Sequence, residues 1–323
     1  MVSLPNTAIA GEAVIASSRD KDWPSALPII RIDIMSEPQL KSFLDTTVVR
    51  GLLIGTHVYR DFLRRVLGER LYVGRFVDME FKRGVLLPLI DFLNTLAMSH
   101  IRTIGDAEKA WSHRFEGREV KLLLALTGDI FDRHGLNRTK ARDKQRGIMA
   151  LAAAIKSYDR AMRRRFIDPS QDRTHCGRGA QPLRASVSPE QARQDLNAYA
   201  DQFGDVAHDR RTCHIREFFD HFGPDLTACV KHAESLPDLR KHDNVRAMAV
   251  EVKKIQDNTS VCSCATCERL GDVVIAVGAP RSMQVETTDQ SFPHWCEPTR
   301  QPHRVLDGEL KHLNDLGKTK ATD

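Results

Sequence analysis

The chain has 323 residues, of which 41% are hydrophobic and 28% are charged, values close to those of soluble globular proteins. No window approaches the roughly 18 consecutive apolar residues of a membrane span, and the start of the chain lacks the basic and apolar regions of a secretory signal. A cytoplasmic protein without membrane attachment is therefore expected, and its seven cysteines do not indicate a disulfide framework.

The N-terminal part of the chain is expected to contain an extension and then a first buried strand. Residues 1–35 show no sustained period and predict an extension, although 29–35 alternate in the manner of a strand. The run KSFLDTTVV, residues 41–49, is apolar and rich in β-branched residues. This composition favours a buried strand that ends near Asp45 and leads into a helix.

Helical periodicity dominates the next hundred residues. Apolar residues recur at helical spacing over 59–99, and Pro88 predicts a kink or a break inside this stretch. Residues 105–111 have the composition of a helix start, and 122–131 are expected to continue the same helix. A further helix is predicted over 147–166 because of its apolar period.

A change of composition follows. Residues 168–189 are rich in Pro, Gly and Ser and predict a long loop, which is the best internal boundary of the sequence. Ser188 and Gln191 then resemble a capping box at the start of a helix, and short helices are expected as far as about residue 255.

The C-terminal part returns to an α/β pattern. The apolar segment GDVVIAVGAP, 271–280, predicts a helix, and 283–288 predict a short strand that leads to Asp289. A last strand is expected at 303–306, followed by a flexible tail at 311–323.

Several of these apolar elements end or begin with an acid. Strand ends at one edge of a parallel sheet converge on a crevice, so acids at these positions are expected to meet there. Carboxylates held together repel one another unless a cation lies between them, and oxygen ligands suit Mg²⁺ or Mn²⁺. We call these four residues the acidic cluster: Asp45, Glu80, Asp272 and Asp289.

The segments that carry the acidic cluster resemble those of PIN-domain nucleases. FLDTTVVRGLL is similar to the opening strand of that family, and FVDMEFKRGVL to its helix with a glutamate. GDVVIAVGAP resembles its third acidic segment, and VETTDQSF its T-x-D-x-x-F ending. The resemblance covers about 36–95 and 262–306 and is silent between them.

This resemblance implies a fold and an activity. The fold would be a three-layer α/β/α PIN-like domain at 36–310, with a central mostly parallel sheet and a large, mainly helical insertion at about 100–260. The activity would be that of a metal-dependent endonuclease, in which the acidic cluster binds Mg²⁺ or Mn²⁺ and is catalytic. Thr47 and Thr287 would support the cofactor with their hydroxyls. RNA is implied in preference to DNA, together with an antitoxin or defence partner, and a homodimer is compatible with the family.

Other interpretations of the same residues stay open. Taken singly, Asp272 fits a helix cap, Asp45 and Asp289 fit turns after strands, and Glu80 fits a helix surface. Asp78 is an alternative to Glu80 as the second acid. The chain could also be a non-catalytic nucleic-acid-binding or scaffold protein with the same fold and a zinc site, or a helical partner-binding protein. The zinc ligands would be Cys262, Cys264 and Cys267.

The basic residues are concentrated in two stretches, 138–146 and 160–166. Such stretches can neutralise phosphates of a nucleic acid, although a solvated helix face beside acidic neighbours explains them equally well. His208, His214 and His221 do not share one helical face, so a solvated helix is the preferred interpretation for them.

Overall fold

The computed structural model places seven stretches of the chain, all of which belong to one compact unit spanning 40–323. The expected extension at 1–35, the strand at 29–35 and the tail at 311–323 lie outside the described residues, as does nearly all of the loop at 168–189. The described residues are 41–55, 57–67, 71–113, 118–165, 188–201, 215–257 and 264–306.

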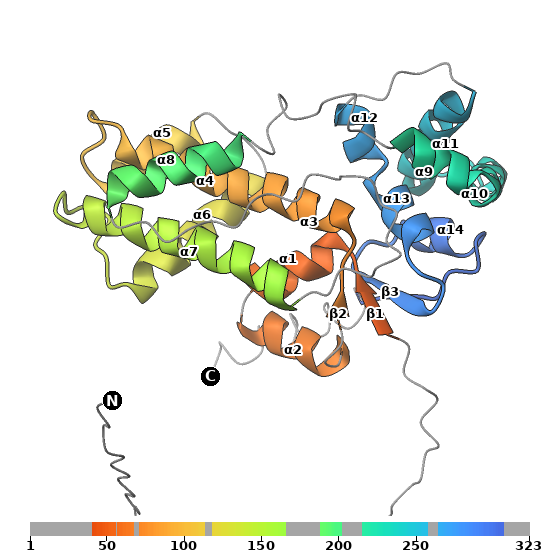
Figure 1. Cartoon of the computed structure of the whole chain (residues 1–323), viewed down its shortest axis with the longest axis horizontal. Coiled ribbons are helices and arrows are strands. Elements are labelled where there is room, and N and C mark those ends of the chain that lie inside the picture. The colour runs from red at the N-terminus through yellow and green to blue at the C-terminus, as the bar shows by residue number, and fades with distance from the viewer. Residues whose placement is uncertain are drawn as a thin grey trace, which may run out of the picture. The chain divides into compact units, whose positions relative to one another are not determined.

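A four-stranded sheet with the order β2-β1-β3-β4 forms the centre of the fold, and all three of its strand pairs are parallel. This confirms the expected α/β class, and the sheet lies beside α1 and α3 in Figure 1. In the central pair, Leu44 lies opposite Glu286. The strands are β1 (Lys41–Leu44), β2 (Leu71–Tyr72), β3 (Met283–Thr287) and β4 (His303–Val305).

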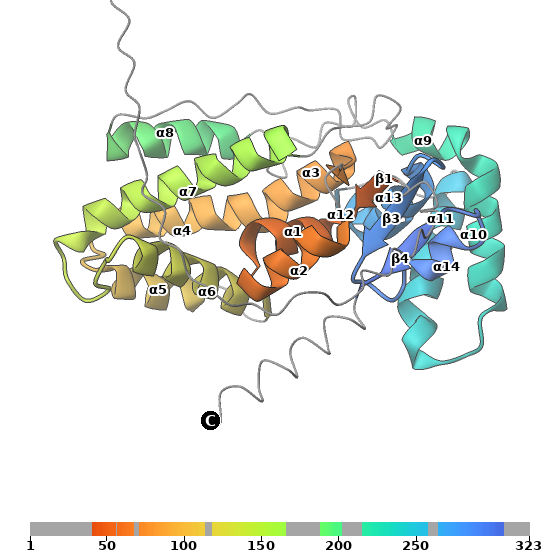
Figure 2. The same ribbon diagram turned by 90° about the horizontal axis from the view of Figure 1, so that it is seen from below.

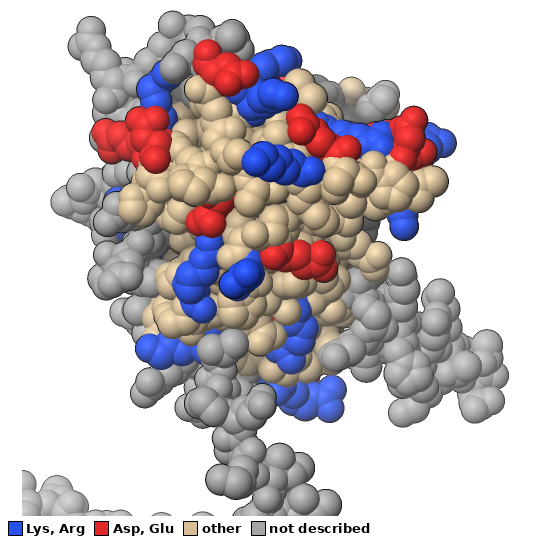
Figure 3. All heavy atoms as spheres, turned by 90° about the vertical axis from the view of Figure 1, so that its right-hand side faces the viewer, with Lys and Arg blue, Asp and Glu red and all other residues tan. Residues whose placement is uncertain are grey.

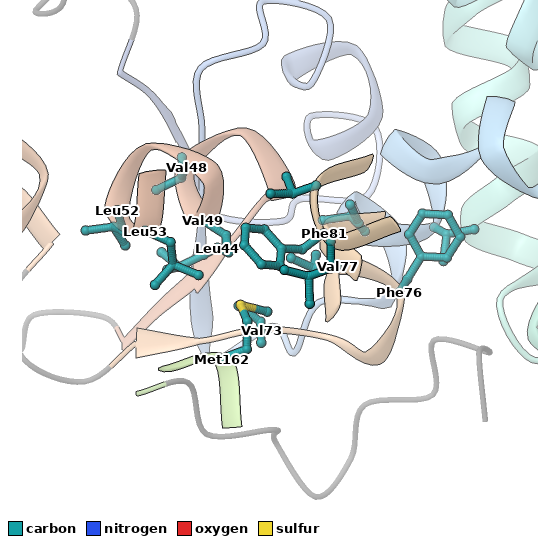
Figure 4. Packing of buried hydrophobic residues seen from close by; sticks show 14 of the residues in the cluster. Leu44, Val48, Val49, Leu52, Leu53, Val73, Phe76, Val77, Phe81 and Met162 are labelled. Carbon is teal, nitrogen blue, oxygen red and sulfur yellow. The ribbon is translucent and has the colours of Figure 1, made fainter. Parts of the chain in front are cut away.

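The hydrophobic core next to β1 comes from three neighbouring helices: α1 (Thr46–Ile54), α2 (His57–Leu67) and α3 (Arg75–Phe81). Leu44, Val48 and Phe81 are completely buried there, and Figure 4 shows their side chains packed together. Each such side chain contributes about 1.5–3 kcal/mol of transfer free energy. This packing fixes α1, which begins directly after β1, against the sheet.

Near Pro88, where a break was predicted, the chain changes from α-helix to a π-helical turn and back to α-helix. A π-helical turn, η1 (Lys82–Leu86), joins α3 to α4 (Leu87–Ala97), and Pro88 lies in the first turn of α4. Because proline has no N–H, it cannot continue the hydrogen-bond ladder of a preceding α-helix. The wider turn accommodates this loss, with the Leu87 N–H bonded to the carbonyl of Lys82.

Helix α4 packs against four further helices (Figures 1 and 2). The expectation of one helix running from 105 through 131 was wrong, because α5 ends at Ser112 and α6 is a separate helix. Helix α5 starts at a capping box in which Thr103 and Asp106 bond each other's backbone N–H groups. The four helices are α5 (Ile104–Ser112), α6 (Arg118–Arg133), α7 (Asp143–Arg165) and α8 (Pro189–Ala200).

A second group of helices precedes and covers the C-terminal strands. Within it α10 packs against α9, α11 and α14, and α13 packs against α14 and α3. Phe292 and Trp295 are completely buried beside the last strand. The elements are α9 (Ile215–His221), α10 (Gly223–Ser235), η3 (Arg240–His242), α11 (Asp243–Gln256), α12 (Cys264–Arg269), α13 (Gly271–Gly278) and α14 (Pro293–Cys296).

Two further observations concern the whole unit. In the described part of the chain no strand lies between Tyr72 and Met283. The interpretation of the helices at about 100–260 as an insertion stays a prediction. The search of the described residues also finds no helix with the length and apolar character needed to cross a membrane.

Candidate acidic site at the carboxyl edge of the sheet

Asp45 lies at the carboxyl end of β1 and caps α1. Its backbone N–H donates to the Glu286 carbonyl at 3.0 Å, which ties it to β3. Its Oδ1 accepts the Thr46 N–H at 2.5 Å, and its Oδ2 accepts the hydroxyls of Thr47 at 2.6 Å and Thr287 at 3.0 Å. With only 3% of its surface exposed, Asp45 is held in one orientation by neighbours from both central strands.

Asp289 lies two residues beyond the end of β3, in the turn that leads to α14. Its N–H donates to the Thr287 hydroxyl at 2.9 Å, and its Oδ1 accepts the Ser291 N–H at 2.8 Å. Thr287 therefore contacts both strand-end acids, because its hydroxyl also donates to Asp45. The side-chain oxygen thus links the ends of two strands that are adjacent in the sheet.

Asp272 lies in the first turn of α13 but is not its cap. The cap residue is Leu270, which makes no side-chain hydrogen bond, so capping does not explain the acid. The Ser291 hydroxyl donates to Asp272 Oδ2 at 3.5 Å, which connects this helix to the turn after β3. Ser291 thus contacts both Asp272 and Asp289.

Glu80, and not Asp78, joins the acidic cluster. Asp78 is paired with Lys82, a lysine with only 1% of its surface exposed. Glu80 accepts a hydrogen bond from the Thr46 hydroxyl, next to Asp45. A Cβ atom added at Gly271 would lie 2.7 Å from Glu80 Oε1, so the glutamate reaches the backbone beside Asp272.

The charges of the acidic cluster act on one another. Burial first, and then the three other carboxylates, raise the pKa of Asp272 well above its ordinary value. The pKa of Asp45 is raised as well, by burial, although the hydrogen bonds from Thr47 and Thr287 oppose this effect. The structure therefore brings all four acids together as the sequence predicted, in a region of concentrated negative charge.

The spacing of the acids bears on what the site can hold. Within the described residues, no three His, Cys, Asp or Glu side chains already have the spacing of direct ligands to a single ion. Carboxylate oxygens are ligands that Mg²⁺ and Mn²⁺ accept, and these ions keep several waters. Water-bridged contacts or a change of side-chain position are needed for all four acids to bind one ion.

The cysteine segment cannot be compared with the predicted zinc site. Cys262 lies outside the described residues, and so does the side chain of Cys264, whereas Cys267 is buried. Near the last strand, burial raises the pKa of the Cys296 thiol to about 12, so this side chain stays protonated at neutral pH.

Four cations of the basic stretches are engaged in contacts within the fold, which weakens the case for these four as phosphate ligands, whereas Lys140, Arg142 and Arg160 are exposed. On a different face, that of α10 and α11 in Figure 3, Lys and Arg side chains are interspersed with Asp and Glu. Two of the suggested histidines, His208 and His214, lie outside the described residues. The engaged cations are Arg138 with Asp132, Lys144 with the carbonyls of Met98 and Ile101, Arg146 with Asp143, and Arg163 with Asp159.

Two residues of the site were not singled out by the sequence. Thr46 connects Glu80 to the end of β1, and Ser291 connects Asp289 to Asp272. A signal was present in the motif itself, since Ser291 follows Asp289 by two residues, the spacing at which an aspartate bonds a backbone N–H.

No protein-family model, curated protein or solved structure matches the chain, so the function of the site is inferred from its geometry and its sequence motifs.

Proposed function

We propose that this protein is a metal-dependent nuclease with a PIN-like three-layer α/β/α fold, which hydrolyses phosphodiester bonds in RNA in preference to DNA. One observation carries the proposal: four carboxylates from β1, α3, α13 and the turn after β3 act on one another at the carboxyl edge of a parallel sheet. Ligands of open α/β sheets bind at this edge.

The donor set supports a hard divalent cation. Asp45, Glu80, Asp272 and Asp289 would hold Mg²⁺ or Mn²⁺, since the pKa of Asp272 is raised by neighbouring negative charge that a cation would offset. When bound, such an ion activates water and stabilises the leaving oxygen of a phosphodiester. The preference for RNA comes from the resemblance of the motifs.

The residues around the acids have separate roles in this proposal. The hydroxyls of Thr47 and Thr287 donate to Asp45 Oδ2 and so fix the direction of the carboxylate. The Ser291 N–H does the same for Asp289. Asp272 holds a proton more readily than an exposed aspartate, because burial and nearby carboxylates raise its pKa. Cation binding would displace that proton.

The test is cleavage of single-stranded RNA in Mn²⁺ by the parent protein and by Asp45→Asn and Asp289→Asn variants. Both substitutions keep the side-chain volume and remove one negative charge, and we expect cleavage to fall by about 100-fold or more. Asp61→Asn is the matched control, because this acid is exposed on α2, and it should cleave at the parent rate.

Circular dichroism of each variant separates loss of chemistry from loss of folding. Cleavage at the parent rate by the two folded site variants would refute the nuclease proposal. A single-stranded DNA of the same base sequence is assayed in parallel, and faster cleavage of that strand would reverse the assigned substrate preference.

A further inference from the structure

Three histidines from separate parts of the chain meet beside α14, and we call them the histidine cluster: His232 of α10, His242 at the end of η3 and His294 of α14. The His232 Nε2 and His294 Nδ1 atoms are 3.4 Å apart. The ring centres of His294 and His242 are 5.1 Å apart with the rings nearly perpendicular, and those of His294 and His232 are 5.6 Å apart.

The hydrogen bond between His232 Nε2 and His294 Nδ1 depends on how many protons the two rings carry. A neutral imidazole has one N–H donor and one acceptor nitrogen, so two neutral rings can share a hydrogen bond. A pair with one proton added retains an acceptor. When both rings are cationic every ring nitrogen is a donor, so His232 Nε2 and His294 Nδ1 would face each other as two N–H groups in adjacent positive rings.

The surroundings of His294 disfavour added positive charge. Burial first, and then His232 and His242, lower the pKa of His294. Lys241 of η3 acts in the same direction, and Glu297 at the end of α14 opposes it. Helix α13 and strand β4 also pack against α14, but among the described residues they contribute no charge to this set.

His242 adds a buried ring without a complete set of partners. Only 6% of its surface is exposed, and among the described residues its Nδ1 has no hydrogen-bond partner. This buried ring lies against His294, the ring of the cluster whose added proton is disfavoured while α14 is docked.

The docking of α14 is connected to the acidic site through a short stretch of chain. His294 follows Ser291 by three residues, and Ser291 bonds both Asp289 and Asp272. A further contact between α10 and α14 is a 3.4 Å hydrogen bond from the Cys229 thiol to the Trp295 carbonyl, which is weak because a thiol is a poor donor. Movement of α14 would thus displace the turn that carries Asp289.

We propose that the histidine cluster is a proton-sensitive joint, which holds α14 on α10 at neutral pH and loosens segment 289–296 when the solution is acidified. The joint does not depend on the nuclease proposal. Only its effect on activity, through displacement of Asp289, depends on that proposal.

The sign of the effect follows from linkage. The pKa of His294 is lower in the folded protein than in the unfolded chain, so the unfolded chain binds more protons below about pH 6.5. Stability is therefore lost as pH falls through about 6.5 towards the folded value, and it is recovered as pH rises again.

Hydrogen–deuterium exchange of the metal-free full chain tests the joint without any assay of activity. After correction for the intrinsic pH dependence of exchange, the amides of 289–296 should exchange several-fold faster at about pH 5.5 than at about pH 7.5 in the parent. A His232→Asn, His294→Asn variant should lose most of this difference. His134→Gln, at an exposed position, should keep it.

Each alternative result is decisive. Unchanged exchange of 289–296 in the parent, or an undiminished pH effect in the double variant, would overturn the proposal. If the double variant fails to fold, the single His232→Gln variant takes its place with the same criterion. Stoichiometric Zn²⁺ uptake by the chelator-treated parent, abolished by His294→Asn, would assign the histidine cluster to metal and also overturn the joint.

Discussion

Two acidic regions, Glu286 on β3 and the acidic cluster at the carboxyl edge of the sheet, differ in how their charge is balanced. Glu286 of β3 has 2% of its surface exposed. Its Oε2 accepts from Arg304 Nε at 2.8 Å and its Oε1 from Arg304 Nη2 at 2.9 Å. Asp45 is also buried and Asp272 is partly buried, and these two acids meet hydroxyls, backbone N–H groups and other carboxylates. Glu286 is neutralised by the fold itself, whereas under our proposal a cation from solution balances the charge of the acidic cluster.

The contrast separates a structural acid from a functional one by its surroundings. The charge of a buried carboxylate beside an arginine is balanced within the protein, and loss of either partner destabilises the fold. Such a carboxylate has no charge left for a ligand to balance. Carboxylates that raise one another's pKa destabilise the metal-free protein, and groups of this kind are concentrated at functional sites. The following experiments challenge this distinction, from the largest effect to the smallest.

Arg304→Ala should cost about 3 kcal/mol of unfolding free energy, because Glu286 then remains buried without its cation. Urea denaturation at neutral pH measures the loss. A second change, Glu286→Gln, removes the stranded charge and should restore much of the stability. If Arg304→Ala alone costs nothing, Glu286 is not balanced in the way the comparison requires.

Mn²⁺ should stabilise the folded protein through the acidic cluster. At a concentration of 100 times Kd, a ligand that binds only the folded state adds about 2.7 kcal/mol to the unfolding free energy. Thermal denaturation with and without the ion checks this, and Asp45→Asn should show little shift. Glu286→Gln, on the neighbouring strand, should keep the full shift, and its loss there would contradict the contrast.

Thr47→Val should lower stability by about 1.5 kcal/mol, since it removes a 2.6 Å hydrogen bond to a buried carboxylate while keeping the side-chain shape. Chemical denaturation at neutral pH gives the value. Thr227→Val is the control, because its exposed hydroxyl donates to the Gly223 carbonyl and accepts from Gln256 Nε2 at 3.3 Å, and neither bond involves a buried charge, so a clearly smaller loss is expected. Equal losses in both variants would mean that Asp45 gains nothing special from Thr47.

Asp272→Asn should stabilise the metal-free protein by about 1 kcal/mol at neutral pH, a sign opposite to that of most substitutions. The folded pKa of Asp272 lies above its unfolded value, so the cost of its charge appears as pH rises from about 3.9. Denaturation midpoints measured between acid and neutral pH should show the variant and parent converging in acid. A destabilised variant at neutral pH would refute this picture of the cluster.

Much of the site was predictable because its acids lie at the ends of simple elements. Apolar, β-branched runs located β1 and β3, so the positions of Asp45 and Asp289 followed from chain geometry. The choice between Asp78 and Glu80 did not follow, because both lie on one short helix. Only the fold shows that Asp78 is paired with Lys82 while Glu80 reaches Thr46.

Contacts between distant segments account for most of what the sequence left open. Lys144 donates to the carbonyls of Met98 and Ile101, so a lysine of the basic stretch holds the loop between α4 and α5. The histidine cluster unites three segments without any local spacing pattern. The separation of α5 from α6 likewise reflects how both helices pack on α4, which no local period encodes.

The parallel pairing of β1 with β3 joins residues on either side of most of the chain: Thr287 bonds Asp45 across 242 positions. A ribosome that has released only the first half of the protein has therefore exposed two of the four carboxylates, and β1 has β2 but not yet its central partner β3. Such distant pairing forms slowly. The acidic cluster can thus form only after translation has passed Asp289, so its assembly belongs to the last stage of folding.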